Sequence, residues 1–190
     1  MERIERFLEK VNRELIFIFN GLRGGFKIVG SVALILQAIL ALQSTELSPE
    51  LRQRLELLVL EYITQIDDYD IVIYSTNDTD LTQNYTILNN KGFIKESTDP
   101  DSMPSIEDIK NGIKMICRTQ TPEIKIDYIG INKSLDREKD CPIKYDSPSK
   151  YYIGDTHYIY LEKVCKLTNY KVQINNSTHN RDKKNIKKKI

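Results

Sequence analysis

Two segments rich in β-branched and aromatic residues constrain the fold most, because each carries acidic side chains among its apolar ones. The first is DDYDIVIY, residues 67–74, and the second is IKIDYIGI, residues 124–131. Both compositions are typical of β-strands. An ionised carboxylate is expensive to bury without a partner, so the folded protein is expected to provide these acidic groups with one.

The remaining segments predict helices around these strands. Apolar residues recur every three or four positions from Ile4 to about Asn20, and Ser48-Pro49 is a typical helix start. The expected helices cover about 4–20, 32–43, 49–64, 81–90 and 156–170, with a helical turn at 106–110. The expected strands cover 26–29, 67–74, 93–96, 113–119 and 123–131, the last two forming a β-hairpin. Residues 97–105 and 133–149 are polar and irregular.

This pattern predicts an α/β (α+β) fold, a small mixed β-sheet flanked by helices with a helix near the C-terminus. The 190 residues suit a single domain, with a core at 20–132 and a helical C-terminal extension at 150–190 that ends in a basic tail. The tail, RDKKNIKKKI, carries six basic residues and one acidic residue. Such a tail either contacts phosphate groups or is simply a solvated terminus.

Composition favours an intracellular, non-membrane protein. Apolar residues make up 40% of the chain and charged residues 29%. The longest apolar stretch, 31–42, is shorter than the roughly 20 residues that cross a bilayer. The three cysteines are widely spaced, and no secretory signal is recognisable, which indicates a reducing compartment. Abundant Ile, Lys, Asn and Tyr suggest an AT-rich genome, such as that of a virus or a parasite.

Asp68 and Asp70 are the first candidate site residues. Side chains alternate along a strand, so these two project to one side while Tyr69 and Ile71 point to the other. Paired carboxylates with substrate phosphates are a usual way to hold Mg²⁺. The alternative is a solvated start of a strand.

Asp127 is the third carboxylate. It lies inside the apolar run 124–131 and shares its face with Lys125 and Ile129, so it can complete a three-carboxylate metal site with Asp68 and Asp70. The alternative is an edge strand on which Asp127 faces water beside Lys125.

Gly30 and Ser31 form the fourth element, between an expected strand and an expected helix. A glycine lets the backbone approach a ligand, and the following helix N-terminus offers N–H groups to a phosphate. The same pair also serves as an ordinary turn and helix cap.

The segments KIVGSVALILQ, DDYDIVIY and IKIDYIGI, in this order, resemble the nucleotidyltransferase superfamily of the DNA polymerase β type. The resemblance covers residues 27–131 and is nearest to small stand-alone members that include toxin-like proteins. It implies that Gly30 and Ser31 contact a triphosphate, that Asp68 and Asp70 bind two metal ions, and that Asp127 helps to activate the attacking hydroxyl. The helix at 49–64 makes the gap before Asp68 longer than is usual in the family.

The expected function is therefore transfer of a nucleoside monophosphate from a nucleoside triphosphate, ATP included, to a hydroxyl. Mg²⁺ or Mn²⁺ is the expected cofactor, and RNA, protein or a small molecule is the acceptor. Lys163 and Lys166 either grip the triphosphate or face solvent. Two alternatives stay open: a catalytically inactive binding protein of the same fold, and a nucleic-acid-binding accessory protein that uses the basic tail and the tyrosines of 145–160.

Overall fold

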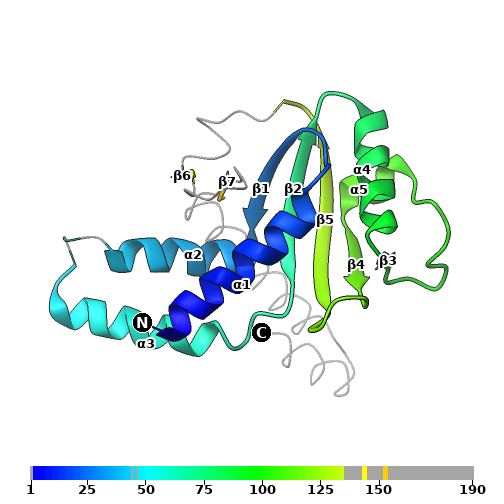
Figure 1. Ribbon diagram of the computed structural model, residues 1–190. Helices are drawn as coiled ribbons and strands as arrows, with labels where there is room; N and C mark the ends of the chain where they lie inside the picture. The colour runs from blue at the N-terminus through cyan, green and yellow to red at the C-terminus, as the bar shows by residue number, and fades with distance from the viewer. Residues whose placement is uncertain (1, 44, 46, 135–142, 145–151, 154–190) are drawn as a thin grey trace, which may run out of the picture. The chain divides into compact units, whose positions relative to one another are not determined.

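The computed structural model describes residues 2–43, 45, 47–134, 143–144 and 152–153. The chain divides into two units, 1–154 and 155–190, and the second lies outside the described residues. The helices are α1 (Glu2–Phe19), α2 (Gly30–Gln43), α3 (Pro49–Tyr62), α4 (Asp78–Asn90) and α5 (Ile106–Asn111). The strands are β1 (Gly25–Val29), β2 (Tyr69–Ser75), β3 (Phe93–Lys95), β4 (Ile113–Cys117), β5 (Ile124–Asn132), β6 (Ile143–Lys144) and β7 (Tyr152–Ile153) (Figure 1).

The strands form a mixed sheet in the order β3-β4-β5-β2-β1-β7-β6. β2 runs antiparallel to β1 and parallel to β5, and β4 runs antiparallel to β5. The expected mixed sheet with flanking helices, an α+β architecture, is thus confirmed. The expected hairpin of 113–119 and 123–131 is confirmed as β4 and β5.

Two short strands differ from the sequence-based expectation. β6 interrupts the segment of 133–149 that was expected to be irregular, and β7 lies in the expected C-terminal extension of 150–190, ahead of the helix expected at 156–170. β7 pairs in parallel with β1 at Lys27 and Ile28. This pairing satisfies backbone groups on a side of β1 that would otherwise be an open sheet edge. The expected helix at 156–170 and the basic tail lie outside the described residues.

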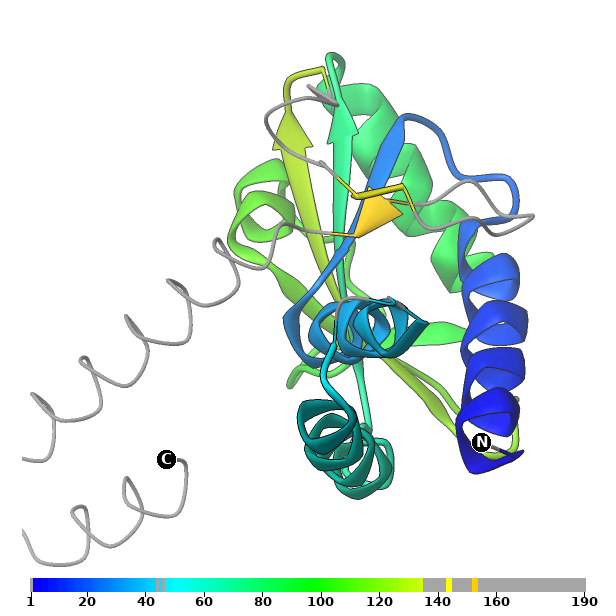
Figure 2. The same cartoon turned by 90° about the vertical axis from the view of Figure 1, so that its left-hand side faces the viewer.

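The helices α1, α4 and α5 cover one face of the sheet. Along β5, Ile124, Ile126, Tyr128 and Gly130 are buried on this face, while the residues between them are partly exposed. The Tyr128 hydroxyl donates to the Leu81 carbonyl of α4 at 2.7 Å. Burial there raises the pKa of Tyr128 far above its usual value. Figure 2 shows α1 and α4 on the same side of the sheet.

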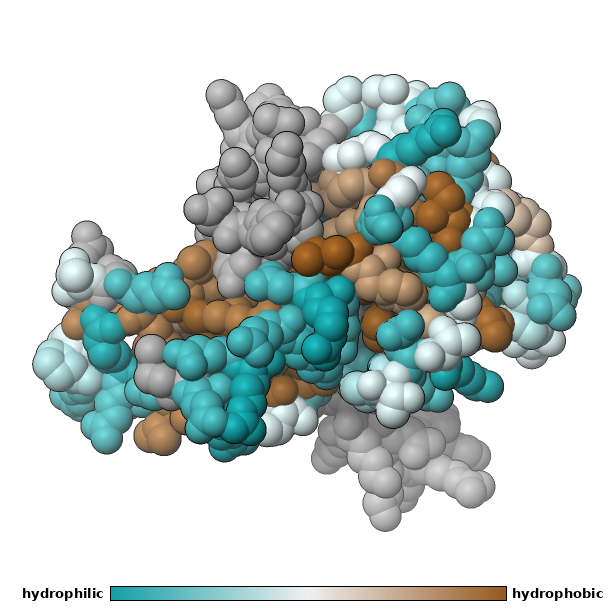
Figure 3. All heavy atoms as spheres, viewed as in Figure 1, coloured by the Kyte–Doolittle hydropathy of each residue, from teal (hydrophilic) through white to brown (hydrophobic). Residues whose placement is uncertain are grey.

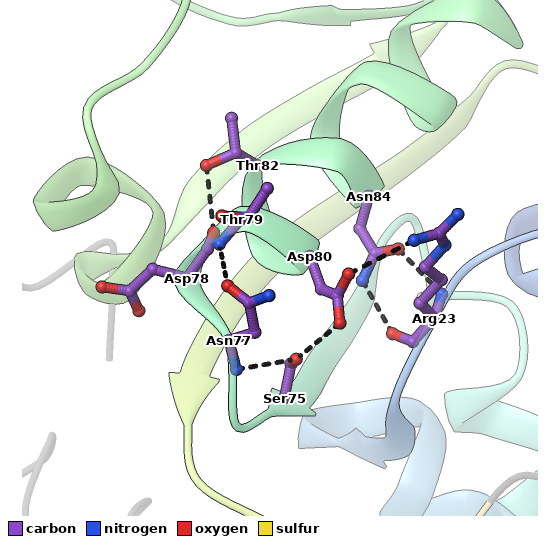
Figure 4. A network of polar contacts seen from close by, with 8 residues as sticks. All are labelled: Arg23, Ser75, Asn77, Asp78, Thr79, Asp80, Thr82 and Asn84. Carbon is purple, nitrogen blue, oxygen red and sulfur yellow. Dashed lines mark hydrogen bonds and ion pairs between the residues drawn. The ribbon is translucent and has the colours of Figure 1, made fainter.

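A polar network joins the segment before β1 to α4 (Figure 4). The Asn84 side chain accepts from the Arg23 backbone N–H and donates to the Arg23 carbonyl, both at 2.8 Å. Asp80 accepts from the Ser75 hydroxyl at 3.3 Å and pairs with Arg23 at 3.5 Å. Asn77 caps α4 by accepting from the Thr79 N–H, so α4 begins at Asp78 rather than near residue 81. The network therefore fixes where β1 enters the sheet.

α2 and α3 form a helical hairpin that extends from the end of β1 (Figure 1). Ser48 caps α3, its hydroxyl accepting from the Leu51 N–H at 3.3 Å, and Pro49 occupies the first turn, as expected from the sequence. Among the helices described, none has the length and apolar character needed to span a membrane.

Candidate functional site

Asp70 and Asp127 lie directly opposite each other on the neighbouring strands β2 and β5. Paired residues of adjacent strands share a face of the sheet, so both carboxylates lie on the face away from α1 and α4. Both residues are partly exposed, while Tyr69 and Ile71 on the other face of β2 are buried. Strand alternation therefore puts both carboxylates on one face, as expected from the sequence, and the register of β2 and β5 puts them side by side.

β5 is an interior strand, which excludes the edge-strand alternative for Asp127. It is flanked by β2 on one side and β4 on the other. The partner of Asp127 on β4 is Lys114, and the two side chains form an ion pair with a nitrogen–oxygen distance of 3.9 Å. The Asp127 side chain is 27% exposed and that of Lys114 is 65% exposed. Asp127 therefore has a cationic partner within the sheet, which reduces the cost of its partial burial.

Asp68 immediately precedes β2 on the same face as Asp70. Together with Asp127 it lines a cavity of about 160 Å³. Lys114, Lys125 and Glu96 also line this cavity. Asp68 and Asp70 each make further interactions, so their charges are not isolated.

Gly30 begins α2 at the point where β1 ends beside Asp70. The register pairs Val29 with Asp70, so the next residue, Gly30, reaches the Asp70 side chain. A Cβ added to Gly30 would lie 1.7 Å from Asp70 Oδ2, and the Gly30 φ of +69° is one that residues with side chains rarely adopt. This position therefore requires glycine for two separate reasons.

Ser31 is exposed in the first turn of α2. The first N–H groups of a helix have no partner inside the helix and favour an anion. The Gly30–Ser31 turn thus lies next to the acidic pair and offers donors beside it. The predicted triphosphate contacts Lys163 and Lys166 lie outside the described residues.

A divalent cation is the cofactor that these residues suggest by their chemistry. Asp70 and Asp127 supply hard oxygen ligands side by side, and Asp68 adds a third from the same face, which suits Mg²⁺ or Mn²⁺. Within the described residues, however, no group of three or more His, Cys, Asp or Glu side chains is arranged to hold a metal ion. Carboxylate oxygens are suitable ligands for such a cation. In this structure, however, Asp127 forms an ion pair with Lys114 instead of joining a metal-binding group.

Sequence reasoning missed Lys114 as a neighbour of Asp127. The register of the β4–β5 hairpin contains this information, because it pairs Lys114 with Asp127. It also missed Lys27, a buried lysine on the same face of β1 as Val29. Lys27 Nζ lies 5.5 Å from the centre of the Tyr74 ring, and Lys133 Nζ lies at the same distance from that ring. A lysine in an otherwise apolar strand is the signal that identifies Lys27.

The candidate site thus combines acidic side chains from β2 and β5, a helix N-terminus and several lysines on one face of the sheet. Such a set can place a cation beside an anionic ligand such as a phosphate. Comparisons of the chain with protein-family models, with curated proteins and with solved structures find no match.

Proposed function

We propose that this chain is a nucleotidyltransferase that depends on Mg²⁺ or Mn²⁺ and moves a nucleoside monophosphate from a nucleoside triphosphate to a hydroxyl. One observation carries the proposal. Asp70 and Asp127 are paired across β2 and β5 on one face, with Gly30 at the start of α2 against the Asp70 carboxylate.

The order of the parts adds support. A strand, a Gly-Ser turn, a helix, an Asp-x-Asp strand and a later Asp strand follow one another in the resemblance to the nucleotidyltransferase superfamily. In this chain β1, α2, β2 and β5 occur in that order, and β1, β2 and β5 are neighbours in the sheet. α3 is the additional element between α2 and β2.

Asp70 and Asp127 would hold the cation, with Asp68 as the third ligand. The cation would supply positive charge to the triphosphate and lower the pKa of the acceptor hydroxyl. Asp127 must leave Lys114 to take part. Because Lys114 is 65% exposed, Asp127 is 27% exposed and the charged atoms are 3.9 Å apart, water partly screens the pair, which contributes about 1 kcal/mol and does not prevent the rearrangement.

The remaining residues position the substrate. The N-terminus of α2, with Gly30 and Ser31, would bind the triphosphate through backbone N–H groups and the Ser31 hydroxyl. Lys114, once released from Asp127, lies at the same cavity as Asp68 and would offer a positive charge to a phosphate oxygen. The protein's contribution is then mainly position and charge.

Transfer of label tests the proposal. The purified chain is incubated with each nucleoside triphosphate labelled at the α-phosphate, with Mg²⁺ or Mn²⁺, and with total RNA or total protein. We expect label on an acceptor, and a loss of about 100-fold or more in Asp70→Asn and Asp127→Asn. Asp99→Asn, in an exposed loop away from β2 and β5, is the matched control. Absence of transfer with every nucleotide, or equal transfer by Asp70→Asn, would contradict the proposal.

A nucleotide-binding protein without transferase activity is the second candidate. The ion pair of Lys114 with Asp127 favours it, because a lysine already neutralises one of the carboxylates. Equilibrium dialysis separates the two candidates. Binding of nucleotide that persists without divalent cation and without any transfer of label supports the second one, whereas binding that requires Mn²⁺ supports the first.

A further inference from the structure

The outer side of α3 carries an apolar stripe that is largely exposed within the described part of the chain. Leu51, Leu55, Leu58 and Tyr62 follow one another at spacings of four, three and four residues. Leu51 is 55% exposed, Leu58 50% and Tyr62 51%, whereas Leu55 is half-buried. Figure 3 shows apolar side chains between charged ones along the α2–α3 hairpin. We call these four residues the α3 stripe.

The neighbouring side of α3 packs on the chain itself. Val59 is 2% exposed, and the Arg52 guanidinium donates to the Leu42 carbonyl at the end of α2. α3 is therefore anchored along one side and presents the α3 stripe on another. Leu51 and Leu58 lie seven residues apart, as do Leu55 and Tyr62, which is the heptad spacing of a helix that pairs with a second helix.

We propose that the α3 stripe pairs with the same stripe of a second copy of this chain, in an antiparallel arrangement around a two-fold axis. An interface of this kind is formed by one surface patch that is complementary to itself. Antiparallel pairing sets Leu51 of one copy against Tyr62 of the other. It sets Leu55 against Leu58, so each layer combines two apolar side chains.

The charged residues beside the α3 stripe favour a second copy of the chain in the antiparallel orientation. Arg54 and Glu61 each directly precede a stripe residue and lie seven positions apart, along the same edge of the stripe. In the antiparallel pair, Arg54 of one copy lies across from Glu61 of the other, and the two-fold axis creates this pair twice. A parallel pair would bring Arg54 beside Val59 instead, with no opposite charge. The charge pattern therefore complements itself in one orientation only.

Arg54 is available for this contact. Within its own chain it pairs with Glu50 at 2.8 Å, but the two side chains are 71% and 74% exposed. A pair that exposed is weak and exchanges readily. Arg54 can therefore turn to a partner that approaches the stripe.

The size of the contact sets the expected affinity. The 14 residues of α3 span about 21 Å, so one helix pair buries less surface than a standard stable interface. We therefore expect a dimer with a dissociation constant of about micromolar order. This inference does not depend on the proposed transferase activity.

Sedimentation velocity of the full chain between about 1 and 200 µM tests the proposal. We expect a reversible monomer–dimer equilibrium, and a dissociation constant raised by about 100-fold in Leu58→Glu. Ile16→Glu, at a 45% exposed apolar residue of α1, is the matched control and should leave the equilibrium unchanged. Circular dichroism of each variant checks that the fold is retained.

Charge exchange tests the orientation. Arg54→Glu and Glu61→Arg should each weaken the dimer, and the double variant should restore it, because the opposite charges meet again. A chain that stays monomeric at every concentration would overturn the proposal, as would a dimer that Leu58→Glu leaves intact. A double variant that fails to recover would overturn the antiparallel arrangement.

Discussion

Gly30 and Asp70 are in direct contact, because the absent side chain of Gly30 leaves the space that the Asp70 carboxylate occupies. A Cβ at residue 30 would lie 1.7 Å from Asp70 Oδ2 and 2.6 Å from its Cγ. The first turn of α2 and the acidic start of β2 are therefore coupled. Any change at residue 30 must move the carboxylate, the turn or both.

Gly30→Ala should destabilise the protein by about 1–3 kcal/mol, since it adds a strained φ and a steric clash. Urea denaturation measures this change. Gly21→Ala is the control that separates the two costs, because Gly21 has a φ of +80° but its nearest contact to an added Cβ is at 4.0 Å. Equal losses in the two variants would show that the contact with Asp70 contributes nothing.

Lys114→Met should strengthen binding of Mn²⁺ several-fold while changing the free energy of unfolding by less than about 1 kcal/mol. The ion pair with Asp127 is partly exposed and weakly stabilising, yet it competes with a cation for the carboxylate. Electron paramagnetic resonance of free Mn²⁺ measures the binding. Lys110→Met, which removes the 3.4 Å pair with Asp78, is the matched control. Weaker binding in Lys114→Met would show that Lys114 supports the ligand instead.

The faces of the strands could be predicted from sequence, because alternation is a local property. Asp127 shares a face with Lys125 and Ile129, as the sequence indicated, since their neighbours Ile126 and Tyr128 are buried. The β4–β5 hairpin was likewise readable from two β-rich runs joined by a short turn. Local pattern was enough for both features.

The pairing between distant strands was not predictable in the same way. β2 lies next to β5, and β1 next to β7, although many residues separate them. A side-chain pattern states which face a residue takes, but not which strand will lie beside it. The contact of Lys114 with Asp127 was missed for another reason, because the hairpin was predicted without its register. The strand β7 was missed because its partner β1 comes so much earlier in the chain.

Ser105→Ala should raise the pKa of Asp108 toward its ordinary value of 3.8. The Ser105 hydroxyl and backbone N–H both bond the Asp108 carboxylate in the capping box of α5, and these bonds lower its pKa. Because the folded pKa is depressed, this stabilisation is complete above the unfolded pKa and is lost as pH falls through the folded one. The stability difference between wild type and variant should therefore shrink in acid. A proton titration of Asp108 by NMR, with Glu107→Gln as control, measures the shift, and an unchanged pKa would contradict the expectation.

Lys91→Met should lower the free energy of unfolding by about 1–3 kcal/mol. The Lys91 ammonium donates to the carbonyls of Phe17 and Ile18 at 2.8 Å and also to that of Asn20, which satisfies the end of α1. Burial lowers the pKa of Lys91 to about 8, so the group keeps its proton at neutral pH. Thermal unfolding measures the loss. Lys95→Met, which removes bonds to Ser102 in a surface loop, is the comparison and should cost less.

Asn84→Asp should destabilise the protein strongly although it barely changes the size of the side chain, because Asn84 belongs to the hydrogen-bond network of Figure 4. Asn84 is fully buried, and its amide both accepts from the Arg23 N–H and donates to the Arg23 carbonyl. A carboxylate of the same shape keeps the first bond but has no N–H for the second, and it brings a charge into a buried site. We expect a loss of about 2–4 kcal/mol in the free energy of unfolding at neutral pH that becomes smaller in acid, because a protonated carboxyl regains a donor.

Urea denaturation at several pH values measures both effects, and Asn89→Asp on the exposed C-terminal turn of α4 is the matched control. A loss independent of pH would show that packing at this position, rather than the bond to Arg23, carries the stability.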